Sequence, residues 1–262
     1  PWGEDFLALE LPDSWQVQLP ERMDISAQIN GKETEIVQAA LENPEDSRPL
    51  SQRDLSGRTV LIIVDDNTRP TPADRFFHLL IDALLQGGSD AEKIHVMPAL
   101  GIHTPMSEAE MAEKIGAENL KRVSWSNPDA FDAGRHRDFG QTSRGTPVIL
   151  DQKVHESDLV ILVGMIEPHL WAGFGGGMKN LFPGVAAAEA IGHHHGMIAE
   201  PPYLFNRVGM APDENTFRQD LEETRSLIRA DFFTVNVLLD ENRRIAAAFA
   251  GGDHDLPGEH AH

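Results

Sequence analysis

Apolar residues fall into short continuous runs, separated by polar segments with helical spacing. The clearest runs are 59–64, 94–100 and 159–163. Continuous apolar runs of this length are typical of strands that are buried on both faces. Helical patterns follow the first two runs, and such alternation is typical of parallel strands joined by crossover helices. The sequence therefore predicts a three-layer α/β domain with a mainly parallel sheet and helices on both faces.

Local signals set the boundaries of the helices. Pro70 and Pro72 predict the start of a helix that continues to about 85, where two glycines end it. Ser107 with Glu110 has the spacing of a capping box. Asn215 is expected to cap a helix over 216–228. The other expected elements are strands at 15–19, 25–29, 123–125 and 147–150, helices at 34–41, 178–182 and 186–191, and a hairpin of 234–239 with 244–249.

Composition narrows the classes of function. Acidic residues outnumber basic ones by 42 to 22, for a formal charge of −20, which argues against nucleic acid or an anionic membrane as a partner. The chain has no cysteine, so disulfides, zinc-thiolate sites and a cysteine nucleophile are excluded. No apolar stretch approaches the roughly 20 residues of a membrane span, and no leader pattern is present, so we expect a cytoplasmic protein.

Polar groups follow each of the three clearest strands. Arg69 comes after the first strand, His103 after the second and His169 after the third. Because the carboxyl ends of parallel strands meet at one edge of a sheet, we expect these side chains to gather there. A guanidinium matches a carboxylate or phosphate in bidentate geometry, and histidine exchanges protons near neutral pH. This edge is the expected binding site.

The loop after the third strand carries the most chemistry. Three consecutive glycines, Gly175, Gly176 and Gly177, can adopt positive φ angles and turn their amides toward an anion. The short helix expected after them would add its own N-terminal amides to this cradle. Lys179 follows, and three histidines occupy 193–195. The loop is therefore expected to combine an anion cradle with an amine and several imidazoles.

At these residues the chain resembles a known family, the nickel-pincer-dependent lactate racemases and related 2-hydroxyacid racemases and epimerases. The resemblance rests on Asp66-Asn67-Thr68-Arg69-Pro70, on Gly101-Ile102-His103, and on the segment from Pro168-His169 to Lys179 and Pro183-Gly184. A histidine stands sixteen residues after the lysine, which selects His195. The similarity continues downstream at 231–239 and spans nearly the whole chain.

The resemblance implies a cofactor that accepts hydride, which no amino-acid side chain does. In the family this is a nickel-pincer nucleotide, a pyridinium mononucleotide whose two thiocarbonyl arms hold nickel. The resemblance implies covalent attachment at Lys179 and nickel ligation by His195, with a nitrogen donor suited to square-planar nickel. The other implied roles are acid/base catalysis by His103 and His169, substrate anion binding by Arg69, an active-site lining of Asp66 and Thr68, and a phosphate cradle at Gly175, Gly176 and Gly177.

The resemblance also implies a domain organisation. Residues 1–252 correspond to the cofactor-binding N-terminal domain, and the Gly- and His-rich 253–262 to the start of a linker toward a C-terminal domain outside this sequence. The implied partners are a small 2-hydroxy acid, that C-terminal domain and the cofactor-building enzymes.

Two alternatives come from other classes of function. One is a zinc hydrolase that uses His103, His169 and the histidine cluster, with Asp65 or Asp66 as a further ligand. The second is a non-catalytic fragment that holds a cofactor or ligand. In the racemase interpretation His193 and His194 are spare, at the surface or behind the site.

Overall fold

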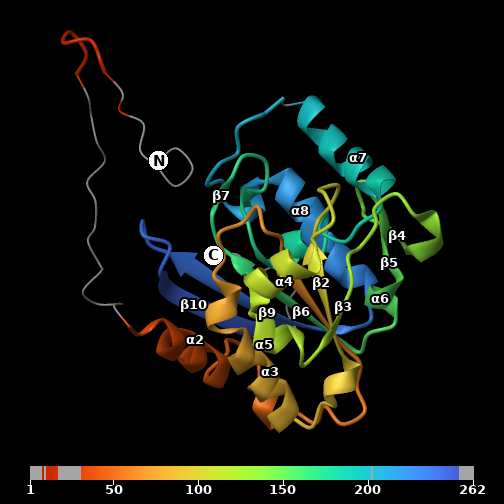
Figure 1. Ribbon diagram of the computed structural model, residues 1–262. Coiled ribbons are helices and arrows are strands. Elements are labelled where there is room, and N and C mark those ends of the chain that lie inside the picture. Colours follow the sequence, from red (N-terminus) through yellow and green to blue (C-terminus); the bar gives the residue numbers. More distant parts are fainter. Residues whose placement is uncertain (1–7, 9, 17–30, 202, 254–262) are drawn as a thin grey trace.

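The computed structural model describes residues 8, 10–16, 31–201 and 203–253. Its centre is a six-stranded sheet with the order β10-β9-β6-β1-β2-β3 (Figure 1). β10 is antiparallel to β9, and every other neighbouring pair is parallel. The strands of this sheet are β1 (Val60–Asp65), β2 (Ile94–Ala99), β3 (Ser124–Trp125), β6 (Leu159–Met165), β9 (Asp231–Leu239) and β10 (Ile245–Asp253).

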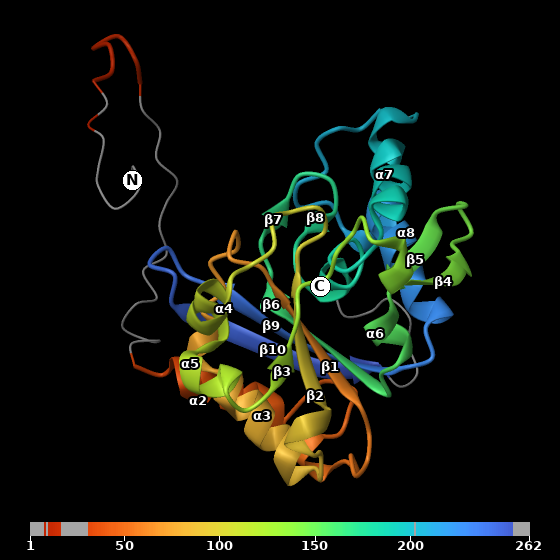
Figure 2. The same cartoon turned by 45° about the vertical axis from the view of Figure 1, so that its right-hand side comes forward.

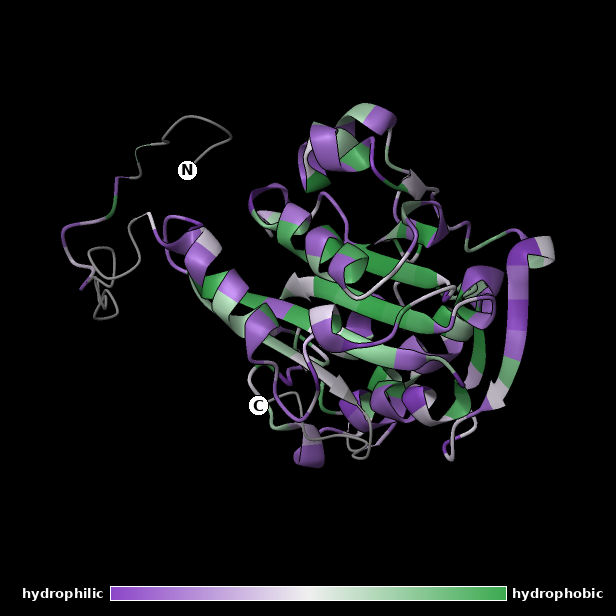
Figure 3. Ribbon diagram, turned by 90° about the horizontal axis from the view of Figure 1, so that it is seen from below, coloured by the Kyte–Doolittle hydropathy of each residue, from purple (hydrophilic) through white to green (hydrophobic). Residues whose placement is uncertain are grey.

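The apolar runs form the central strands, as predicted. Every residue of β1 and of β6 is buried. Alternate residues of β1 enter different cores, with Ile62 in one hydrophobic cluster and Ile63 in the other. A fully buried aliphatic side chain contributes about 1.5–3 kcal/mol, so both faces of these strands stabilise the sheet. Figure 3 shows the strands as an apolar centre between helices with polar outer faces.

Helices cover both faces of the sheet, which confirms the three-layer prediction (Figure 2). On one face lie α2 (Glu33–Glu42), α3 (Phe77–Gln86), α4 (Glu108–Ile115) and α5 (Ala117–Leu120). On the opposite face lie α6 (Gln152–His155), α7 (Ala188–Gly196) and α8 (Thr216–Glu223). The 3₁₀ turns are η1 (Leu50–Gln52), η2 (Ala73–Arg75), η3 (Ala91–Lys93), η4 (Ala133–Arg135), η5 (Gly177–Asn180), η6 (Met197–Ala199), η7 (Pro212–Glu214) and η8 (Thr224–Leu227).

The two predicted helix caps are present. Ser107 and Glu110 form the capping box of α4. The side chain of Asn215 accepts hydrogen bonds from the amides of Phe217 and Arg218 and caps α8. The helix expected over 216–228 changes to a 3₁₀ turn after Glu223, because α8 ends there and η8 begins.

Other boundaries differ from the prediction. α7 continues to Gly196, so the three histidines lie inside this helix rather than after it. β4 (His136–Gln141) was not predicted; it pairs with β5 (Pro147–Asp151) in a separate two-stranded ladder. A second small ladder joins β7 (Pro168–His169) to β8 (Gly173–Phe174). Of the two early strands, Trp15 and Gln16 are not in a strand, and the remainder lies outside the described residues.

The expected hairpin is formed by β9 and β10. β10 extends to Asp253, so the last strand reaches the first residue of the predicted linker. Residues 254–262 lie outside the described part of the chain. Within the described ranges, the helices are too short or too polar to cross a membrane.

Candidate active site

A cavity of about 570 Å³ lies at the carboxyl edge of the sheet. Its wall combines side chains that follow β1, β2 and β6, three strands that lie side by side. The predicted gathering of Arg69, His103 and His169 at one edge is therefore confirmed. The other predicted site residues in its lining are Asp66, Lys179 and His195, and further lining residues include Asp65, Phe131, Trp171 and Asn180.

His103 is held by a buried carboxylate. Nδ1 of His103 lies 2.6 Å from Oδ2 of Asp66, whose side chain is only 3% exposed, while the imidazole itself is half exposed. Asp66 comes directly after β1 and His103 shortly after β2, so the pairing of these two strands produces the contact. A carboxylate can only accept, so Nδ1 carries the hydrogen and Nε2 is the ring nitrogen left for a ligand.

Thr68 takes a different place from the one expected. It is absent from the cavity lining, and its hydroxyl donates to Oδ1 of Asp66 at 2.6 Å. The amide of Thr68 points to the same oxygen at 3.2 Å. Thr68 therefore does not line the site as the resemblance implied. Its hydrogen bonds instead fix the carboxylate that holds His103, because the short loop turns the threonine back on Asp66.

His169 is fixed by the backbone instead. Its Nδ1 accepts hydrogen bonds from the amides of Trp171, at 3.3 Å, and Ala172, at 3.1 Å. Burial, followed by the charges of Lys179 and Arg69, lowers the pKa of His169 to about 3. The imidazole is therefore neutral, and its remaining nitrogen Nε2 carries the hydrogen.

Arg69 already has a carboxylate partner. Its Nη1 lies 2.8 Å from Oε1 of Glu167, in the loop after β6. Glu167 had no expected role, although its position two residues before His169, just after a buried strand, was an available signal. Both side chains remain partly exposed, so the guanidinium retains other donors for a ligand. Arg69 thus lies in the cavity in a fixed orientation.

Lys179 lies in η5, beside the carboxyl end of β6. Its neighbour Asn180 donates to the carbonyl of Val163 at 2.8 Å and ties this turn to the strand. Burial, followed by the charge of Arg69, lowers the pKa of Lys179 to about 8. A substantial fraction of the amine is therefore neutral near pH 8, the form that reacts as a nucleophile.

His195 presents one free ring nitrogen to the same cavity. Its Nδ1 lies 2.9 Å from the carbonyl of Ile191, one turn earlier in α7. Its ring packs edge-on against Trp171, with 5.3 Å between centroids. Burial lowers the pKa of His195. A neutral imidazole whose Nδ1 donates to the backbone has its Nε2 lone pair available, which is the form that binds a metal.

The other two histidines of the cluster differ in their exposure to solvent. His193 is exposed, whereas His194 is completely buried between Phe182 and Phe217. Nε2 of His194 lies 3.0 Å from the carbonyl of Phe217. His194 therefore joins α7 to α8 behind the site and fixes the face of the helix that carries His195.

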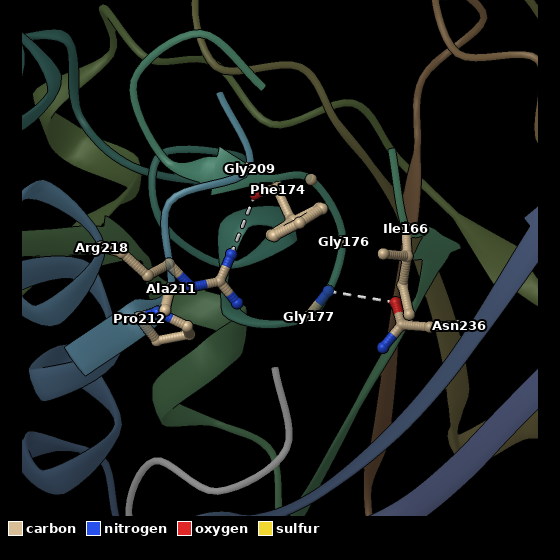
Figure 4. Close-up of a pocket in the computed structure, with 10 residues that line it drawn as sticks. Ile166, Phe174, Gly176, Gly177, Gly209, Ala211, Pro212, Arg218 and Asn236 are labelled. Carbon is tan, nitrogen blue, oxygen red and sulfur yellow. Dashed lines mark hydrogen bonds between the residues drawn. The ribbon is translucent and has the colours of Figure 1, made fainter. Parts of the chain in front are cut away.

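The glycine run lies beside a second cavity, of about 310 Å³ (Figure 4). Arg218 supplies the cation in its wall and is 3% exposed; its guanidinium donates to the carbonyl of Phe174 and pairs with Glu222. Phe174 lines this cavity, whereas Trp171 lines the first one.

The interpretation of the glycines as an open anion cradle is wrong for two of them. The amide of Gly175 donates to the carbonyl of Glu167, and that of Gly177 to Oδ1 of Asn236. A Cβ on Gly176, where φ is +76°, would lie 2.7 Å from both Asn236 Oδ1 and the Met165 carbonyl. Close approach to the sheet therefore requires a glycine here. The assignment of Gly175, Gly176 and Gly177 to the cofactor stays a prediction.

The zinc-hydrolase alternative loses its support. Across the described ranges, no three His, Asp or Glu side chains are grouped so that they could hold a metal ion. A structural or catalytic zinc needs at least three protein ligands.

Sequence comparisons find known proteins that are similar to this chain. The sequence-family model of the lactate racemase N-terminal domain matches residues 2–203. The chain is 29% identical over 252 residues to the lactate racemase of Thermoanaerobacterium thermosaccharolyticum, covering 96% of this chain and 58% of that protein. It is 30% identical over 220 residues to the lactate racemase of Lactiplantibacillus plantarum, covering 84% of this chain and 51% of that protein.

Solved structures give the same result. The lactate racemase apoprotein of Thermoanaerobacterium thermosaccharolyticum superposes with a TM-score of 0.79 at 29% identity, covering 94% of this chain and 56% of that one. A Thermotoga maritima protein has a TM-score of 0.64 at 21% identity, covering 85% and 54%, and shares the fold. The chain spans about half the length of these relatives. It belongs to the lactate racemase N-terminal domain family.

Proposed function

We propose that this chain is the cofactor-holding domain of a racemase or epimerase that acts on lactate or a related 2-hydroxy acid. The observation that carries the proposal is the single cavity that brings together Arg69, His103, His169, Lys179 and His195. It contains a guanidinium that can bind an anion, two imidazoles that can exchange protons, an amine with a lowered pKa and a third imidazole with a free nitrogen. The two curated relatives described above are both named lactate racemase.

The proposed cofactor is a nickel-pincer nucleotide joined to Lys179. The residues present fit this group, because a buried amine with a lowered pKa and an imidazole with a free nitrogen line one cavity. The grouping of donors also fits, since the cofactor would bring the remaining nickel ligands itself. When bound, it supplies the hydride acceptor that the side chains lack. Arg218, which lines the cavity beside the glycine run, is proposed to hold its phosphate.

The chain's own residues have separate tasks in this reaction. Arg69 binds the substrate carboxylate and is oriented by Glu167. His103 and His169 take the hydroxyl proton from one enantiomer and return a proton to the other. His195 would hold nickel through Nε2, and Trp171 packs against its ring. Asp66 positions His103 through its hydrogen bond to Nδ1.

A second domain is proposed to complete the substrate site. The chain covers only 51–58% of its named relatives. The described part of the cavity is open at a rim where Ile102 and Phe131 are 59% and 75% exposed. Apolar side chains at the mouth of a polar site are typical of a surface that another domain covers. Substrate choice among 2-hydroxy acids would then depend partly on that domain.

The decisive experiment examines Lys179. The full-length protein should be produced together with the cofactor-building enzymes and examined by intact mass, peptide mapping and nickel analysis. We expect an added mass on the peptide that contains Lys179, about one nickel per chain and racemisation of a 2-hydroxy acid. Lys179→Ala should abolish all three, and His195→Ala should keep part of the adduct while losing nickel.

Two lysine variants serve as controls. Lys179→Arg preserves the positive charge in the cavity but cannot form the linkage. Lys121→Arg changes an exposed lysine paired with Glu118 and should leave adduct and turnover unchanged. If Lys179→Arg retains full turnover, Lys179 acts only as a counter-charge and the covalent attachment is refuted.

A further inference from the structure

The two histidines proposed to exchange protons with the substrate are held in opposite ways. Nδ1 of His103 faces a carboxylate oxygen of Asp66, which can only accept a hydrogen bond. Nδ1 of His169 faces two backbone amides, those of Trp171 and Ala172, which can only donate. A neutral imidazole carries one hydrogen, so the partner of Nδ1 determines whether Nε2 has a hydrogen or a lone pair.

The partners fix opposite tautomers. His103 carries its hydrogen on Nδ1, so its Nε2 presents a lone pair. His169 accepts at Nδ1, so its Nε2 presents N–H. Among the described residues, no protein group forms a hydrogen bond to Nε2 of either histidine. Both nitrogens therefore remain for a ligand in the cavity that the two side chains line.

We infer that the resting chain is asymmetric toward its substrate: His103 is a proton acceptor, and His169 is a hydrogen-bond donor. This inference rests on the proposed function, and it deepens that function by assigning the first proton transfer. The hydroxyl proton of the enantiomer whose oxygen meets His103 passes to Nε2 of that residue. The resulting imidazolium retains its hydrogen bond to the Asp66 carboxylate, which stabilises the positive charge until Nε2 returns the proton to the product oxygen. His169 donates a hydrogen bond to that oxygen and keeps its own hydrogen.

The mirror-image substrate meets a different situation. Its hydroxyl oxygen meets the N–H of His169, which has no lone pair at Nε2 to accept a proton. His169 must first move its hydrogen to Nδ1, and that breaks the bonds from Trp171 and Ala172. Leaving two backbone amides without acceptors is unfavourable, so the first turnover of this enantiomer should be slower by about tenfold or more.

The surroundings of the two rings act in the same direction. Burial disfavours the protonated form of His169, and the positive charges of Lys179, Arg69 and Arg218 act in the same direction. Beside His103 lies the negative charge of the Asp66 carboxylate. The same cavity thus contains one imidazole beside a negative charge and one among positive charges.

Asp66 is a positioning residue in this arrangement, and one substitution tests it. Oδ1 of Asp66 accepts from both the amide and the hydroxyl of Thr68. In Asp66→Asn the amide oxygen should keep those bonds, which turns the NH₂ group toward His103. Nδ1 of His103 would then have to accept, and its hydrogen would move to Nε2, as happens when an aspartate behind a catalytic histidine becomes asparagine.

The tautomers can be measured without the cofactor. Nitrogen-15 spectra of the ring nitrogens, assigned with His103→Gln and His169→Gln, should show Nδ1–H for His103 and Nε2–H for His169 at neutral pH. Asp66→Asn should convert His103 to Nε2–H and leave His169 unchanged. Asp90→Asn, at an exposed aspartate outside the cavity lining, should alter neither ring. A His169 ring with Nδ1–H, or the same tautomer for both residues in the wild-type chain, would overturn the inference.

Single-turnover measurements on the cofactor-loaded protein give a second readout. One enantiomer should react about tenfold faster in the first turnover, and Asp66→Asn should slow that enantiomer more than the other. Equal first-turnover rates contradict the inference. Failure of the proposed function is recognised separately, because it leaves Lys179 without an adduct while the ring tautomers of the unloaded chain stay as described.

Discussion

Nζ of Lys114 in α4 lies 2.6 Å from Oδ1 of Asp65, with both side chains at most 7% exposed. The same ammonium donates to the carbonyls of Asp66 and Arg69, each at 3.0 Å. The loop that carries two site residues is therefore attached to α4 by one buried cation. Burial raises the pKa of Asp65, and the charge of Lys114 opposes that rise.

Lys114→Met is expected to destabilise the chain by about 3–5 kcal/mol, because it leaves a buried carboxylate without its partner. Urea unfolding followed by circular dichroism measures this difference. Lys121→Met is the matched control, since Lys121 pairs with Glu118 at the exposed surface and should cost less than about 1 kcal/mol. Similar losses for the two variants would show that the Lys114 contacts do not stabilise the loop.

Gly176→Ala should destabilise the chain by about 1–3 kcal/mol, because it adds a Cβ against backbone and Asn236 at a positive φ angle. The control is Gly192→Ala, inside α7, where an added Cβ meets nothing within 4 Å. That change should stabilise the chain by about 0.5–1 kcal/mol, because alanine is the better helix former. Thermal melts of the two variants should move in opposite directions, and a shift in the same direction would contradict the geometry described for η5.

The amine of Lys179 should titrate near pH 8, because burial and Arg69 lower its pKa. An unperturbed lysine has a pKa of about 10.4, so at pH 8 a far larger fraction of Lys179 is neutral than of an ordinary lysine. Reductive methylation with carbon-13 formaldehyde makes the titration visible by NMR. One dimethyl-lysine signal should shift near pH 8 and disappear in Lys179→Arg, and a Lys179 signal that shifts only above pH 10 would refute the lowered value.

The folded protein is expected to lose stability in acid because of His95. Its ring bridges Ser124 and Ser126, and burial, then Lys153 and Arg135, lower its pKa from 6.5 to about 4. Between these values the unfolded chain binds a proton that the folded chain does not, so stability is present above pH 6.5 and is lost as the pH falls toward 4. His95→Gln should remove about 1 kcal/mol of this dependence, allowing for partial exposure.

Melting temperatures of wild-type and His95→Gln proteins between pH 7 and pH 4.5 test this prediction. The wild-type curve should fall more steeply than that of the variant. Parallel curves would mean that the ring is charged in the folded protein or that another group dominates the pH dependence.

The elements set by local chemistry could be predicted from the sequence. The buried strands, the capping box at Ser107 and the cap at Asn215 depend on residues that lie near each other in the chain. β4 was not predicted, because its side chains are mostly exposed and follow no strand periodicity. Its pairing with β5 depends on backbone hydrogen bonds, which the pattern of side chains does not report.

The same distinction between local and long-range features applies to the candidate site. Its residues could be found from loops that follow strands and from the family resemblance, but their contacts could not. Asp66 meets His103 across 37 positions, and Arg69 meets a glutamate that sequence reasoning left without a role. The glycine run shows the limit most clearly. Its composition is typical of an anion loop, yet two of its amides are already bonded within the protein.

Those internal bonds have a mechanical consequence. Gly177 is tied to Asn236 of β9, Gly175 to Glu167 after β6, and Asn180 to Val163 within β6. Lys179 lies between these attachments, so its backbone shares the stiffness of two central strands. We therefore expect a group joined to its amine to be attached at a rigid point of the fold. The proposed reaction needs opposite faces of a planar carbonyl, so the small molecule itself would have to rotate within the cavity that Trp171 lines.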